Sequence, residues 1–140
     1  MAKIELSRVS GDYGFNATDE YGHTIQMDSS PESGGLNYGV RPMQMLLMGL
    51  AGCSAIDVIA ILKKQRQEVR DYKMVVNGDR EPNKEPSLWK EINVEFHLYG
   101  DIDLDKAQKA ADLSIGKYCS VAATLVKAGA EIKYSVTVHP

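Results

Sequence analysis

The most distinctive stretch of this chain runs from residue 41 to residue 66 and reads RPMQMLLMGLAGCSAIDVIAILKKQR. Pro42 suits the first turn of a helix, where its missing N–H group would have no partner in any case. From Met43 to Leu62 almost every residue is apolar or small, and Lys63, Lys64 and Arg66 then complement the helix dipole. Apolar side chains lie all round this predicted helix, so we expect it to be buried on most sides.

A run of this length could also span a bilayer. However, Asp57 lies near its middle, and Gln44, Gly49 and Gly52 interrupt it. A charged group at that depth in a membrane is costly, so we expect a core helix and no membrane association. A chain of 140 residues has few other elements that could cover such a helix, which suggests a partner subunit.

The overall composition indicates one ordinary globular domain, which we expect to span residues 1–140. The chain is 44% hydrophobic and 25% charged, so a core is expected and disorder is not. The formal net charge is −3 and no basic run is interleaved with aromatic residues, which argues against nucleic acid as a partner. The first residues lack the apolar run of a signal peptide, so we expect a cytoplasmic protein.

Alternating apolar and polar residues predict strands on both sides of the long helix. Short antiparallel strands are expected before a loop rich in Ser, Gly and Pro at residues 29–39, and longer strands near residues 72–76, 91–98 and 132–138. Asp103 can cap a helix that ends at Gly116. A further short helix begins at Cys119 and Ser120 and stops at Gly129. Because helices and strands are grouped more than they alternate, we predict an α+β fold with antiparallel sheet.

The two cysteines, Cys53 and Cys119, are the only credible site of chemistry. Cys53 lies midway along the long helix, where a thiol in apolar surroundings is inert. Cys119 begins a helix, where unpaired N–H groups lower a thiol pKa, although it could equally cap or pack beneath that helix. If the two sulfurs meet, the pair could run a dithiol–disulfide cycle. No CxxC is present and the three histidines are isolated from the thiols, so we expect neither a metal site nor a cofactor.

Three segments carry a resemblance to a known family: PMQMLL at residues 42–47, LAGCS at 50–54 and KYCSV at 117–121. Together, at this spacing, they resemble the OsmC/Ohr family, peroxiredoxin-like proteins of oxidative-stress defence, and the order of elements matches over essentially the whole chain. The resemblance implies an intertwined homodimer in which two long central helices pack together. It also implies that Cys53 is the peroxidatic thiol and Cys119 the resolving thiol of an organic hydroperoxide reductase. Dithiols such as dihydrolipoyl groups would supply the electrons.

The chain departs from that family at the positions that activate the thiol. Active members usually carry a glutamate in an N-P-E sequence at the start of the long helix, whereas this chain reads Arg41-Pro42-Met43. They also carry an arginine in or after the N-terminal strands, and this chain has none between Arg8 and Arg41. A peroxidatic thiol needs a cation to hold it as thiolate. Met43 lies about 15 Å from Cys53 along a straight helix, so Arg41 could serve only the Cys53 of a partner.

Two other hypotheses stay open. The chain could be a non-catalytic dimer that binds an apolar small molecule or a reactive sulfur species at its interface, in a pocket lined by Met43, Met45, Met48 and Tyr38. It could also be a structural protein whose cysteines are relics. A cation close to Cys53 would favour the enzyme.

Overall fold

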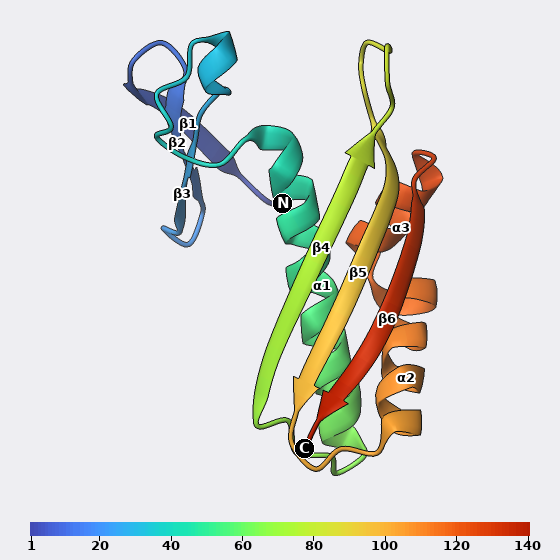
Figure 1. Ribbon diagram of the computed structural model, residues 1–140. Coiled ribbons are helices and arrows are strands. Elements are labelled where there is room, and N and C mark those ends of the chain that lie inside the picture. Colours follow the sequence, from blue (N-terminus) through green and yellow to red (C-terminus); the bar gives the residue numbers. More distant parts are fainter. The chain divides into compact units, whose positions relative to one another are not determined.

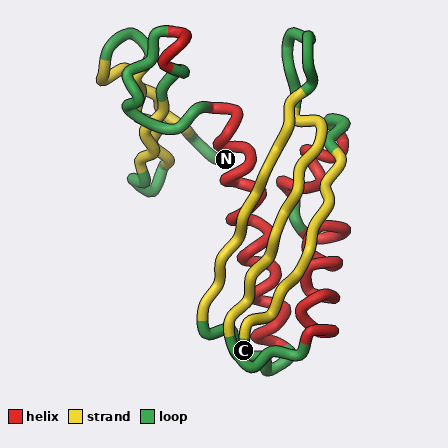
Figure 2. The backbone as a smooth tube through the Cα atoms, viewed as in Figure 1, coloured by secondary structure: helices red, strands yellow, loops and turns green.

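The computed structural model describes all residues, 1–140, and the chain divides into two compact units, Met1–Leu46 and Leu47–Pro140. Each unit contains a three-stranded sheet of its own, shown in Figure 1 and, by type of element, in Figure 2. The α+β class is confirmed. That the whole chain behaves as a single domain stays a prediction.

The first unit is built on the antiparallel strands β1 (Ile4–Ser10), β2 (Gly14–Asp19) and β3 (Thr24–Met27). Their pairing confirms the short N-terminal strands predicted from the alternation. The register places Leu6 opposite Ala17, and Ala17 opposite Ile25, so these three side chains share one face of the sheet. Leu6 and Ile25 are nevertheless exposed, which leaves this sheet with an uncovered apolar face.

The loop that follows β3 is organised around one carboxylate. Asp28 is buried, and its side chain accepts hydrogen bonds from the backbone N–H groups of Ser29, Leu36 and Tyr38. A short 3-10 helix, Pro31–Ser33, lies within this loop, and Val40 bridges back to Met27. The loop is therefore an ordered structure despite its Ser- and Gly-rich composition.

The second unit contains the sheet β4 (Asp71–Arg80), β5 (Trp89–Tyr99) and β6 (Glu131–His139), in that order. β4 and β5 pair antiparallel, as predicted, whereas β6 pairs with β5 in parallel. The chain returns to the start of β6 through two helices, which allows the parallel pairing. All helices of this unit lie on one side of the sheet (Figure 1).

Those crossover helices are α2 (Leu104–Leu113) and α3 (Ser120–Lys127). Asp103 caps α2 as predicted, since its side chain accepts a hydrogen bond from the N–H of Asp105. Gly116 does not end the helix. The chain instead continues from α2 through a π-helical turn, Ser114–Tyr118, directly into α3.

The long helix α1 (Pro42–Lys64) is confirmed, with Pro42 as its first residue. Its buried side chains are spaced four apart: Leu50, Ser54, Val58 and Leu62. Ile56, on the opposite face, is 71% exposed. Within one chain the helix is thus buried along one face, whereas its composition predicted burial on most sides. By length and composition alone α1 could cross a membrane, a test that core helices of soluble proteins also pass.

Candidate active site at the thiol pair

The site begins with two residues one helical turn apart on α1. Cys53 and Asp57 are separated by four positions, so their side chains lie on the same face of the helix. Both are half-buried, and they flank the buried residues Ser54 and Val58. The packing of α1 against the sheet therefore fixes the direction in which both side chains point.

The π-helical turn and α3 bring the second thiol to the same place. The N–H of Cys119 donates to the carbonyl of Ser114, which closes the turn. Cys119 is the N-cap of α3, as predicted, and its Sγ accepts a hydrogen bond from the N–H of Ala122 at 3.3 Å. The thiol is almost completely buried.

The structure brings the two thiols and one carboxylate together. Sγ of Cys53, Sγ of Cys119 and a carboxylate oxygen of Asp57 all lie within 4.8 Å of one another. The sequence left open whether the sulfurs meet, and the structure places them side by side as free thiols. Three potential metal ligands that are separate in sequence therefore form one group in space, and the expectation that the chain holds no metal stays a prediction.

The surroundings of Cys119 keep its thiol protonated. Burial is the largest effect, and with the neighbouring Cys53 it raises the pKa of Cys119 to about 11, although the Ala122 N–H group acts in the opposite direction. The position at a helix N-terminus therefore does not activate this thiol, because desolvation outweighs the helix N–H groups. Cys119 fits a partner thiol better than a primary nucleophile.

Asp57 is a site residue that the sequence reasoning treated only as an argument against a membrane helix. Its Oδ2 accepts a hydrogen bond at 3.0 Å from the hydroxyl of Ser114, a fully buried side chain of the π-helical turn. The spacing of four between Cys53 and Asp57 was the available signal. No sequence pattern pointed to Ser114 as a site residue, because 57 positions separate it from Asp57.

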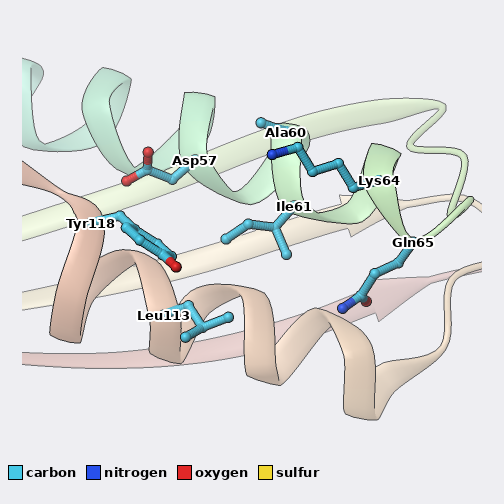
Figure 3. A pocket seen from close by; sticks show the side chains of 7 residues that line it. All are labelled: Asp57, Ala60, Ile61, Lys64, Gln65, Leu113 and Tyr118. Carbon is cyan, nitrogen blue, oxygen red and sulfur yellow. The ribbon is translucent and has the colours of Figure 1, made fainter.

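Asp57 also lines a groove on the surface of the second unit. The groove has a volume of about 370 Å³ and is bounded by side chains of α1 on one side and by Leu113 and Tyr118 on the other, as Figure 3 shows. Its α1 residues include Ile61 and Lys64. A small molecule in this groove would contact Asp57, whose carboxylate lies beside the two thiols.

No salt bridge joins a cation to the carboxylate beside the two thiols. None of the salt bridges in the chain involves Asp57. Lys117, two residues before Cys119, lies over the ring of Tyr118, with Nζ 5.2 Å from the ring centroid. Arg41 is close enough to Asp28 for its charge to help lower the pKa of that carboxyl, which is lowered first by the Leu36 N–H group. A cation close to Cys53 would have favoured the enzyme, and no salt bridge of the chain brings one to the neighbouring carboxylate of Asp57.

The pocket expected for a non-catalytic binding protein stays a prediction, and of its residues Tyr38 makes contacts within the first unit. The hydroxyl of Tyr38 donates to Asn16 and accepts a hydrogen bond from Gln26, both within the first unit. The groove beside Asp57 contains no methionine among its lining residues.

Comparison with known proteins agrees with this architecture. Residues 33–135 match the family described as OsmC-like protein. Protein YhfA of Escherichia coli is 44% identical over 108 residues, which cover 76% of this chain and 77% of YhfA. A hypothetical protein from Aquifex aeolicus has a similar crystal structure, with a TM-score of 0.81 and 32% identity over 100% of this chain and 98% of that one. The organic hydroperoxide resistance protein OhrB of Bacillus subtilis shares the fold, with a TM-score of 0.65 and 18% identity over 98% of both chains.

Proposed function

This chain belongs to the OsmC-like protein family, and we propose that it is a thiol-dependent hydroperoxide reductase in which Cys53 is the peroxidatic and Cys119 the resolving thiol. The observation that supports this proposal is the approach of the two sulfurs to within 4.8 Å. A disulfide requires about 2.0 Å between them, so the two sulfurs have to approach further when it forms.

The different environments of the thiols support the assignment of their roles. Cys53 is half-buried and Cys119 is buried, so Cys53 is the sulfur that a hydroperoxide reaches first. The Cys53 thiolate attacks the terminal peroxide oxygen, which breaks the O–O bond and leaves a sulfenic acid on Cys53 and an alkoxide that takes up a proton. Cys119 then attacks the sulfenic sulfur, forming a disulfide and releasing water. A small dithiol returns the pair to the reduced state by exchange.

The charges around Cys53 suggest that this reaction is slow. A carboxylate lies within 4.8 Å of this sulfur, and no Lys or Arg forms an ion pair with that carboxylate. Lys64 lines the same groove as Asp57 but forms no salt bridge with it, so no cation is fixed at the place where charge develops on the departing alkoxide. We therefore expect turnover with organic hydroperoxides at a rate below that of peroxidases with an arginine beside the thiol. The role in oxidative-stress defence, the homodimer and the cytoplasmic location remain predictions.

The groove supports a second candidate function. Ile61 and Leu113 give it an apolar wall, and Tyr118 an aromatic one, beside the polar end at Asp57. Such a groove suits an apolar small molecule or a reactive sulfur species with one polar end. In this alternative the ligand contacts Asp57, and the thiols are not turned over.

Thiol counting after peroxide addition separates the two functions. Cumene hydroperoxide and hydrogen peroxide are added separately to the pre-reduced protein, to Cys53→Ser and to Cys119→Ser, and free thiols are followed over time. The peroxidase predicts loss of both thiols in the wild-type protein, no accelerated loss in Cys53→Ser, and a sulfenic acid that dimedone traps in Cys119→Ser. Thiol loss no faster than that of free cysteine would rule out the peroxidase and leave the binding function.

A further inference from the structure

We propose that Cys53, Cys119 and Asp57 form a binding site for a borderline-soft divalent metal ion of the zinc class, which the reduced chain holds through two thiolates and one carboxylate. The three ligand atoms lie within 4.8 Å of one another and come from two separate segments, α1 and the start of α3. In a tetrahedral zinc site, neighbouring ligand atoms are about 3.7 Å apart. The three ligand atoms therefore have to move about 1 Å closer together to reach the spacing of a tetrahedral zinc site.

The carboxylate is held as metal-site carboxylates are. Ser114 donates to Oδ2 of Asp57 at 3.0 Å, which orients the carboxylate and leaves its other oxygen, Oδ1, without a hydrogen bond inside the chain. Ser114 is fully buried, so this contact is not exchanged for water. A buried hydroxyl that orients a ligand from behind is the usual outer-shell arrangement of metal sites.

The charge of the group also calls for a cation. Two thiolates and a carboxylate would carry three negative charges, and no lysine or arginine forms a salt bridge with the carboxylate. A divalent ion bound by the two sulfurs stabilises their thiolate forms. Two protons, one from each thiol, go to solvent when the ion binds, and no electrons are transferred.

The ligand types select the ion. Thiolates favour zinc and other soft metals, whereas magnesium and calcium require oxygen ligands in larger number. Three protein ligands leave the fourth tetrahedral position for water or a small molecule. Of the three ligands, Asp57 lines the groove on the surface of the second unit.

Metal binding does not depend on the proposed peroxidase activity. It requires only reduced thiols, so a chain that never reacts with peroxide can still bind the ion. The two properties are linked in one respect, since sulfurs joined in a disulfide no longer provide two thiolates. A preparation oxidised to the disulfide should therefore not bind zinc at this site, and it serves as an internal control.

Metal titration of the reduced, metal-free chain, prepared without a histidine tag, tests the site. Zinc is titrated against a chromophoric chelator, and cobalt is used as the spectroscopic probe. We expect one zinc ion per chain, and cobalt bands that indicate thiolate ligands and tetrahedral geometry. Because two protons leave, the apparent affinity should increase by more than tenfold for each pH unit between pH 6 and 8, as a rough expectation.

Three variants and one control identify the ligands. Cys53→Ser and Cys119→Ser should each weaken zinc binding by at least about 100-fold, and Asp57→Asn, which keeps an acceptor for Ser114, by about 10- to 100-fold. Asp101→Asn, an exposed carboxylate outside the group, should bind zinc as the wild-type chain does. No stoichiometric zinc binding by the reduced wild-type chain would overturn the proposal. Binding that Asp57→Asn leaves unchanged while the variant stays folded would overturn the three-ligand site.

Discussion

The Cys119 thiol lies where a helix N-terminus and a buried environment act on it in opposite directions. Burial is the larger effect and raises its pKa to about 11. In the Cys53→Ser variant, where Cys119 is the only thiol, we expect reaction with iodoacetamide at pH 7 to be at least about tenfold slower than that of free cysteine, whose pKa is about 8.5. The rate should keep increasing beyond pH 9.5, where that of free cysteine levels off. A profile that parallels free cysteine would contradict this assignment.

The raised pKa of Cys119 makes the free energy of unfolding depend on pH. Between the pKa of an unfolded cysteine and the raised pKa of Cys119, the folded chain holds a proton that the unfolded chain has lost. The free energy of unfolding should therefore decrease as the pH rises from about 8.5 to about 11. Denaturant unfolding of the wild-type chain and Cys119→Ser over this range measures the difference. The variant should lose less stability than the wild-type chain over the same interval.

Asp28 gives a prediction at the acid end of the pH scale. The N–H group of Leu36 is the first cause of its lowered pKa, and the N–H groups of Tyr38 and Ser29 and the charge of Arg41 contribute. These interactions stabilise the folded chain above the usual carboxyl pKa. Their contribution is lost as the pH falls through the lowered pKa of Asp28. Amide proton shifts of Leu36 and Tyr38, followed by NMR, should titrate with a midpoint below 3.8. A midpoint at or above that value would show that the carboxylate does not hold the loop.

At the scale of the element, β4 approaches its neighbours closely at Gly78. A Cβ at this position would lie 3.0 Å from the ring of Trp89 and 3.1 Å from a methyl group of Leu47. Both neighbours would have to move, so Gly78→Ala should lower the free energy of unfolding by about 1–3 kcal/mol. Gly116→Ala is the matched control, because a Cβ there meets nothing within 4 Å. Urea unfolding of both variants measures the difference, and equal stability would refute the close packing.

Local pattern predicted the elements better than their contacts. The apolar run with Pro42 identified α1, and the alternation along β5 is matched by its buried residues Ile92, Val94, Phe96 and Leu98. The parallel pairing of β5 with β6 was not predicted, because it depends on how the intervening helices return the chain. The contact of Ser114 with Asp57 was missed for the same reason. Both cysteines were identified from residue type, whereas their approach required the fold.

At the scale of the whole molecule, both units leave apolar surface uncovered. On α1, Met48, Ile56 and Ile59 are 52%, 71% and 40% exposed, and in the first sheet Leu6 and Ile25 are also exposed. Monomeric soluble proteins rarely expose large apolar patches. We propose that a second copy of the chain covers the apolar face of α1, as the resemblance to the OsmC/Ohr family implied, and completes the burial that the composition of α1 predicted.

Sedimentation of the wild-type chain and Ile56→Glu tests this prediction. Burying an isoleucine contributes about 1.5–3 kcal/mol, and a symmetric dimer contains two copies, so the variant should dimerise at least about 100-fold more weakly. Leu104→Glu is the control, because Leu104 is 54% exposed and, as the first residue of α2, favours an acidic replacement. It should dimerise as the wild-type chain does. A wild-type chain that stays monomeric at all accessible concentrations, or an Ile56→Glu variant that dimerises equally well, would show that α1 is not the dimer interface.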